Sequence, residues 1–151
     1  MRSGWASLLA AGTLWAVPLE AQRVAELGVQ ALVATSRPVL AVGGVYGALR
    51  MSQRVRLALT ASAGLASGDA AGRAELLGHF LFNPSQRRGL GLYAGGGIAG
   101  VAGAVDDGYL VLLVGVESRP GAGSGWAAEV GVGGGLRVAA GYHWRRNRRA
   151  E

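Results

Sequence analysis

The chain has 151 residues, enough for one domain with a modest core, and it carries 27 glycines, no cysteine and a net charge of +6. Half of the residues are hydrophobic and only 16% are charged, which excludes intrinsic disorder as the main state of the chain. The glycine content, about 18% against a usual share of roughly 7%, disfavours a helical bundle. The absence of cysteine excludes disulfide scaffolds, Cys-based zinc sites and thiol catalysis.

Residues 1–21 have the organisation of a secretory signal peptide. Arg2 supplies a positive start, and residues 6–17 form an apolar run without charge that ends at a proline. A small residue, Ala21, precedes the expected cleavage site, and the run is shorter than the roughly 20 apolar residues that a membrane-spanning helix needs. The alternative is a buried N-terminal helix of a cytosolic protein. Cleavage would leave residues 22–151.

Eight later segments are predicted strands, and seven of them alternate apolar residues with polar or small ones, which is the period of a β-strand. In the clearest of them, Val55 and Leu57 share one face while Arg56 lies on the other. Segment 39–51 is apolar on both faces, so its facing stays unassigned. The eight segments span residues 24–35, 39–51, 54–65, 73–82, 89–102, 108–118, 126–132 and 138–144.

Turn-forming residues separate these segments, for example Ser36-Arg37-Pro38, Asn83-Pro84-Ser85 and Gly133-Gly134-Gly135. Because the connections are short, neighbouring strands must pair antiparallel. Eight strands of about 11 residues with short turns need roughly 120 residues, which the chain after residue 21 supplies.

The two faces of these strands differ in a way that favours a membrane barrel. The polar face has only about one charge per strand and is otherwise glycine, alanine, serine and threonine, which suit the crowded interior of an eight-stranded barrel. The apolar face would then contact hydrocarbon, and closure would satisfy every backbone hydrogen-bonding group. The sequence therefore predicts an all-β fold, an eight-stranded antiparallel up-and-down transmembrane β-barrel. The alternative is a soluble, lipocalin-like barrel with the apolar face inside.

Charged residues on the inward face predict an ion-paired core, because a buried charge persists only when it is paired. The predicted members are Glu26, Arg54, Arg56, Arg73, Glu75, Glu117, Glu129 and Arg137. With residues 133–135 at a hairpin tip, Glu129 would lie diagonal to Arg137. A selective pore lined by the same charges is the alternative, although eight strands leave too little room for an aqueous channel.

Aromatic residues near the strand ends predict interfacial girdles. They are Phe80, Phe82, Tyr109, Trp126, Tyr142 and Trp144.

A hydrolytic triad is one hypothesis for His79. If the turn over residues 67–74 is centred near its middle, His79 and Ser62 face each other, with Glu75 on the same face. However, Glu75 would lie about 13 Å along the strand from His79, and the set would face the lumen, away from the acyl chains of lipids. An interior histidine with its hydrogen bonds satisfied is favoured. The sequence thus predicts no catalytic, metal-binding or cofactor-binding residue.

Two glycine strings, residues 89–94 and 95–100, match the dinucleotide-binding pattern G-x-G-x-x-G/A. That pattern must follow a buried strand and open a helix, and neither string has this context. Residues 89–105 are also free of charge with GxxxG spacing, as in a transmembrane helix. Seven of these 17 residues are glycine, so a strand is favoured over both alternatives.

The last hairpin, residues 125–144, resembles a known family. Its closing strand alternates apolar residues and ends on the aromatic Trp144, like the C-terminal assembly signal of small eight-stranded bacterial outer-membrane β-barrel proteins, the class of the OmpA membrane domain and OmpX. The resemblance covers residues 22–147 as a pattern. It implies an outer-membrane location, both termini in the periplasm, and outer-membrane lipids, the barrel-assembly machinery and periplasmic chaperones as partners.

These observations divide the chain into a signal peptide (1–21), a barrel (22–147) and a basic tail (148–151). Export disfavours nucleic acid as a partner of the arginines at 145–149, which would instead lie at the membrane edge beside anionic head groups. A disordered, solvated tail is the equal alternative. The expected function is that of a non-enzymatic outer-membrane protein with a structural or envelope-integrity role. The alternatives are a soluble periplasmic barrel that binds an apolar ligand and, less favoured, a lipid-modifying enzyme that uses His79.

Overall fold

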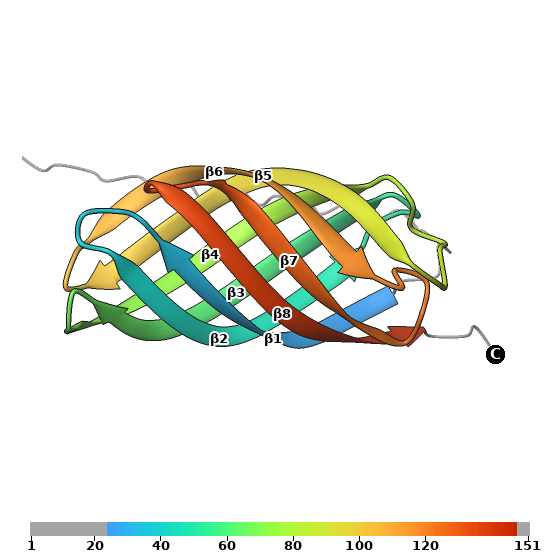
Figure 1. Ribbon diagram of the computed structural model, residues 1–151, viewed down its shortest axis with the longest axis horizontal. Coiled ribbons are helices and arrows are strands. Elements are labelled where there is room, and N and C mark those ends of the chain that lie inside the picture. The colour runs from blue at the N-terminus through green and yellow to red at the C-terminus, as the bar shows by residue number, and fades with distance from the viewer. Residues whose placement is uncertain (1–23, 148–151) are drawn as a thin grey trace, which may run out of the picture.

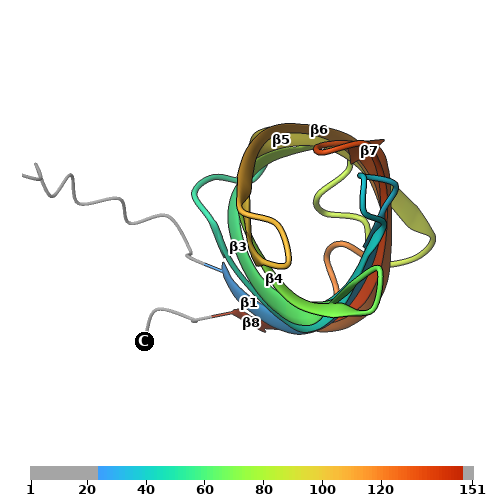
Figure 2. The ribbon, with the colours of Figure 1, turned by 90° about the vertical axis from the view of Figure 1, so that its left-hand side faces the viewer.

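The computed structural model describes residues 24–147, so the predicted signal peptide and the tail at 148–151 lie outside the described residues. Eight strands form one closed barrel in which sequence neighbours pair antiparallel and the last strand pairs with the first (Figures 1 and 2). The strands are β1 (Val24–Ala34), β2 (Leu40–Arg50), β3 (Val55–Ala66), β4 (Asp69–Leu81), β5 (Leu90–Gly103), β6 (Asp107–Ser118), β7 (Ser124–Val132) and β8 (Leu136–Asn147). The predicted eight-stranded antiparallel barrel is confirmed.

The β3–β4 connection is shorter than the sequence predicts. Ala66 pairs with Asp69, so the turn consists of Ser67 and Gly68 alone. Both turn residues have positive φ, 49° and 97°, which is the conformation that two-residue hairpin loops favour because it matches the twist of the strands. As a consequence β4 begins at Asp69, four residues before the predicted start.

Apart from Gly89, which immediately precedes the strand, the glycine strings lie within β5, which passes through a short turn into β6. They do not open a helix, so the dinucleotide-binding alternative is wrong. In the described part of the chain, no helix is both long enough and apolar enough to cross a membrane.

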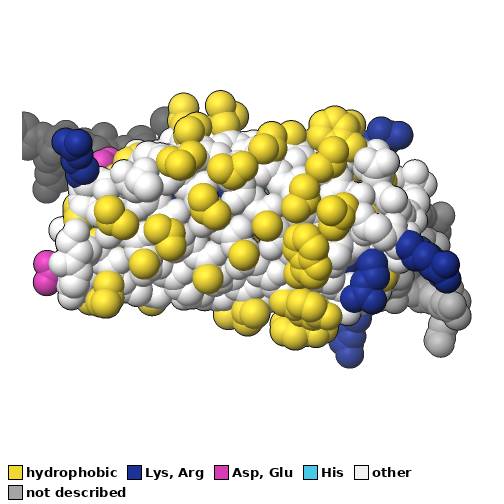
Figure 3. All heavy atoms as spheres, viewed as in Figure 1, with side chains coloured by type: hydrophobic (Ala, Val, Ile, Leu, Met, Phe, Trp, Pro, Cys, Tyr) yellow, Lys and Arg dark blue, Asp and Glu magenta, His cyan; other side chains and the backbone are white. Residues whose placement is uncertain are grey.

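Apolar side chains cover the outside of the barrel (Figure 3). The exposed fraction is 69% for Leu27, 81% for Leu110 and 66% for Leu112. The unassigned strand β2 follows the same rule, because Val45 and Leu49 are exposed while the alternate residues face inward. This facing contradicts a lipocalin-like barrel, in which the leucine-rich faces would line the interior.

The two ends of the barrel carry loops of different length. The end where β1 begins and β8 ends, here called the terminal end, carries the connections 51–54, 82–89 and 119–123. The opposite or far end carries 35–39, 67–68, 104–106 and 133–135 (Figure 1, left). At the terminal end, Gly121 donates a backbone hydrogen bond to Gln86 (2.8 Å) and Arg119 to Gly89 (2.9 Å). The two longest terminal-end loops are thus joined to each other.

Candidate functional site: the charged interior and the apolar exterior

Every glutamate between residues 24 and 147 is buried inside the barrel, together with five arginines. They are Glu26, Glu75, Glu117, Glu129, Arg50, Arg56, Arg73, Arg137 and Arg145. The prediction that Arg54 belongs to this set is wrong, because β3 begins one residue later and Arg54 is exposed in the preceding turn. Sequence reasoning missed Arg50, in the strand without assigned facing, and Arg145, for which it predicted a place at the membrane edge.

One ion-pair cluster lies toward the terminal end and joins two carboxylates to three guanidinium groups. Glu26 lies 2.8 Å from Arg50, 3.2 Å from Arg56 and 3.5 Å from Arg145. Glu117 lies 3.0 Å from Arg56 and 2.8 Å from Arg145. These residues come from β1, β2, β3, β6 and β8, so the cluster crosses the lumen and connects opposite walls of the barrel.

A second cluster lies toward the far end. Glu75 pairs with Arg73 at 2.7 Å and with Arg137 at 2.9 Å, and Arg137 also pairs with Glu129 at 3.0 Å. The pair of Arg137 with Glu129 is the diagonal contact across the β7–β8 hairpin that was predicted from a hairpin tip at residues 133–135. Arg73 also donates to the carbonyl of Gly133 at 3.1 Å, which fixes that turn to the interior.

His79 and Tyr93 lie between the two clusters. Arg56 donates through Nε to Nδ1 of His79 (3.1 Å), so the remaining ring proton of a neutral His79 lies on Nε2, 3.9 Å from Glu129. Tyr93 donates to Glu129 (2.9 Å), and the guanidinium of Arg56 lies 4.9 Å from the centre of its ring. The two clusters therefore form one polar network along the lumen, in which charge-assisted bonds reinforce one another.

His79 and Ser62 do not face each other, which contradicts the triad hypothesis. His79 pairs with Arg56 across β3 and β4, whereas Ser62 pairs with Arg73. Six residues along β3 separate the two positions, about 20 Å at the usual rise of a strand. The error has one cause: the two-residue turn shifts the β3–β4 register away from the longer turn that the sequence indicated. His79 is instead a member of the ion-paired interior.

Glycine is required where a large interior side chain lies against a neighbouring strand. At Gly115 a Cβ atom would collide with the ring of Tyr93, and at Gly95 it would lie 2.5 Å from the ring of His79. The glycine enrichment of this chain therefore reflects, at these positions, the narrow lumen of an eight-stranded barrel.

Most of the predicted interfacial aromatics form a band outside the terminal end of the barrel. Phe80 packs edge-on against Phe82 at 5.5 Å, and Tyr142 against Trp144 at 5.2 Å. Trp126 pairs with Tyr142 across β7 and β8. These residues are exposed on the outer face, as side chains at a membrane interface would be.

Tyr109 does not belong to this band. Its position alternates with the outward Leu110, so it faces inward near the far end and is only partly exposed. Its ring lies 5.9 Å from the guanidinium of Arg73 and packs against buried apolar residues of the lumen. The prediction that it is an interfacial aromatic is wrong, because nearness to a strand end does not determine which face a residue occupies.

Comparisons with known proteins give the fold. No protein-family model and no curated protein matches the chain. The crystal structure of the N-terminal β-barrel domain of Pseudomonas aeruginosa OprF is similar, with a TM-score of 0.70, 14% identity, and coverage of 83% of this chain and 98% of that chain. The solution NMR structure of the de novo designed TMB2.3 has a TM-score of 0.56 and 14% identity, and covers 87% of this chain and 99% of that one. The fold is that of the small eight-stranded barrels that the sequence resembles.

Proposed function

We propose that this protein is an integral outer-membrane barrel with a structural role in the bacterial envelope. The observation that carries the proposal is the distribution of burial: Leu110 is 81% exposed on the outside, whereas Arg56 and Arg137 are fully buried inside. In water the apolar exterior would be unfavourable by about 25 cal/mol for each Å² exposed, and hydrocarbon removes that cost. A closed barrel also leaves no unpaired backbone edge within the bilayer.

The lumen supports a structural role over that of a pore. Ion pairs connect β1 with β3 through Glu26 and Arg56, and β3 with β6 through Glu117. Toward the far end, Glu75 on β4 pairs with Arg137 on β8. Charged side chains that bind one another across the lumen at two levels fill the space that an aqueous channel would need.

Other features of the sequence and the fold support the proposed location. Residues 1–21 have the pattern of a signal peptide, and the closing strand resembles an outer-membrane assembly signal. The far-end connections are short, with two residues between β3 and β4 and three between β7 and β8, which argues against binding of other cells through long outer loops. These features support placement in the outer membrane with the terminal end in the periplasm.

Fractionation tests the proposal. When the full chain is expressed in a double-membraned bacterium, we expect it in the outer-membrane fraction, released only by detergent. We also expect the unboiled protein to migrate differently on a gel from the boiled protein, because a closed barrel resists unfolding by detergent alone. Recovery in the soluble periplasm without detergent, or identical migration before and after boiling, would contradict the proposal.

A further inference from the structure

The exposed charges of the barrel are distributed unequally between its two ends. Five exposed arginines lie at the terminal end, and within residues 24–147 none of them has a carboxylate within ion-pair distance. They are Arg54, Arg87, Arg88, Arg119 and Arg146. The exposed carboxylates of the described chain, Asp69, Asp106 and Asp107, lie at the far end. Figure 3 shows arginine side chains gathered at the right, terminal end. This end therefore attracts anions.

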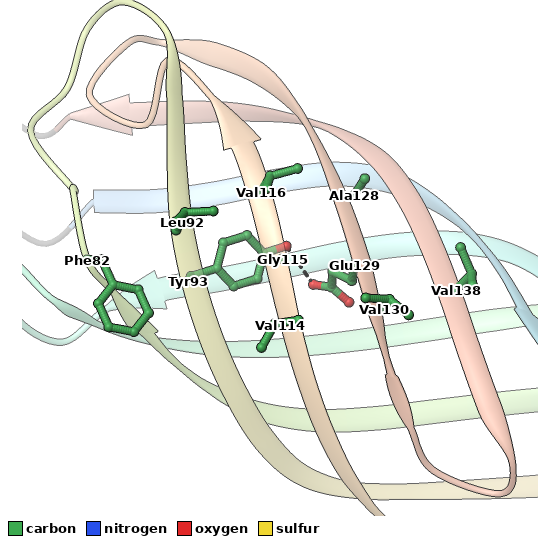
Figure 4. Close-up of a pocket in the computed structure, with 10 residues that line it drawn as sticks. All are labelled: Phe82, Leu92, Tyr93, Val114, Gly115, Val116, Ala128, Glu129, Val130 and Val138. Atoms are coloured by element: carbon green, nitrogen blue, oxygen red, sulfur yellow. Dashed lines mark hydrogen bonds between the residues drawn. The ribbon is translucent and has the colours of Figure 1, made fainter.

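An apolar groove of about 450 Å³ lies on the outer surface over β5, β6, β7 and β8 (Figure 4). Outward side chains form its walls, among them Phe82, Leu92, Val116, Val130 and Val138. Its depth comes partly from Ala128, whose small outward side chain leaves space between larger neighbours. Beneath Gly115, the hydrogen-bonded side chains of Tyr93 and Glu129 support the floor from inside the barrel. The size and the apolar walls suit a hydrocarbon chain.

Two of the arginines lie just beyond this groove. Leu92 and Val116 pair with each other in its wall, and the same strands lead toward the terminal end to Arg88 and Arg119. Arg119 donates its backbone N–H to Gly89, so the two arginines are neighbours across the loop bases. They lie three or four residues from the groove wall, about 10–13 Å along the strands. Half of the hydrocarbon thickness of a bilayer is about 15 Å, so the acyl chain of a lipid whose head group lies at the arginines is long enough to reach the groove.

We propose that the barrel binds an anionic phospholipid in the leaflet at its terminal end, with an acyl chain in the groove and the phosphate between Arg88 and Arg119. Arginine suits this role because its planar guanidinium binds two phosphate oxygens at once. The inference rests on the proposed membrane location and adds a specific lipid class to it.

Quenching of Trp126 by brominated lipid tests the site, since Trp126 faces outward two residues from Ala128. The full chain, with Trp5, Trp15 and Trp144 changed to phenylalanine, is folded into phosphatidylcholine vesicles that contain a minor fraction of phosphatidylglycerol. Two samples of the same lipid composition are compared. In one the phosphatidylglycerol is brominated, and in the other an equal amount of the phosphatidylcholine is brominated instead. We expect phosphatidylglycerol to be enriched about thirtyfold at the groove, as two arginines beside an anionic head group predict.

Three variants identify the cause of any enrichment. Arg88→Gln with Arg119→Gln is expected to abolish it, and Ala128→Phe, which fills the groove, is expected to do the same. The control, Arg54→Gln with Arg146→Gln, removes the same charge from the terminal end at positions outside the groove and should leave the enrichment intact.

The outcomes separate this inference from the proposed function. Equal quenching by the two lipids in a folded, inserted barrel would overturn the lipid site while leaving the membrane location in place. An equal loss of enrichment in the control pair would also overturn it, because diffuse charge would then account for the effect. Absence of quenching by either lipid, together with unchanged gel migration on boiling, would contradict the membrane location itself.

Discussion

Replacing Glu26 with glutamine is expected to lower the free energy of unfolding by about 3–5 kcal/mol, the usual effect of removing one partner from a buried ion pair. The Glu26 carboxylate pairs with Arg50, Arg56 and Arg145, and a neutral amide cannot compensate three cations in the interior. Glu117 would remain as the one carboxylate of this cluster. The measurement is the urea concentration at which half of the vesicle-bound protein loses the gel migration of the folded barrel.

Asp69→Asn is the matched control for this experiment. It makes the same chemical change at an exposed carboxylate of the far end, and we expect it to leave the unfolding midpoint unchanged. If Glu26→Gln and Asp69→Asn had the same midpoint, the ion pairs would contribute little to the stability of the barrel. The argument that the charged interior is structural would then be contradicted.

Replacing Leu112 with arginine is expected to destabilise the folded barrel by about 2–4 kcal/mol, the cost measured for a cation on the lipid-facing surface at the bilayer midplane. Leu112 lies near the middle of β6 and is 66% exposed, so nothing inside the barrel is disturbed by the change. In a water-soluble protein an arginine at so exposed a position would have almost no effect. The effect is measured by the same urea titration in vesicles.

Leu136→Arg provides the comparison at the edge of the lipid-facing surface of the barrel. Leu136 is the first residue of β8 and is 51% exposed, and near the interface the same substitution is expected to cost at most about 1 kcal/mol. A clear difference between the two positions indicates that the exterior is in contact with hydrocarbon. Equal effects at Leu112 and Leu136 would be inconsistent with a bilayer around the strands.

The number of strands and the facing of most of them could be predicted from the sequence. The lipid-facing side of a strand favours apolar side chains, whereas the lumen favours small or polar ones. In β1, for example, Glu26 is buried and Leu27 is exposed, as alternation predicts. Strand β2 could not be assigned, since Leu40 and Val42 face inward as well. These two residues belong to an apolar cluster that fills part of the lumen, so the interior is not uniformly polar. In β2 the burial of the side chains alternates, but their polarity does not, and polarity is all that the sequence reveals.

The errors at the site arose where strands end and where turns set the register. Alternation along β3 gave Arg54 an inward facing, but it does not indicate where the strand stops. Residues 69–72 show little alternation of apolar and polar side chains, so the sequence did not indicate that they belong to β4. The two-residue turn was therefore not recognised, and the predicted pairing of His79 with Ser62 was wrong. Arg145 could have been found, because it continues the inward alternation of Arg137 beyond the closing aromatic.

The claim that the alternating face of the strands contacts lipid is tested most directly by spin labels along β6. The chain has no cysteine, so each single substitution from Leu110→Cys to Val114→Cys provides one unique labelling site. In vesicles, collisions with oxygen, which concentrates in hydrocarbon, are expected to be frequent at Leu110, Leu112 and Val114 and infrequent at the alternate positions. Loss of this alternation, or better access for a water-soluble relaxation agent at these three positions, would contradict a membrane-spanning barrel.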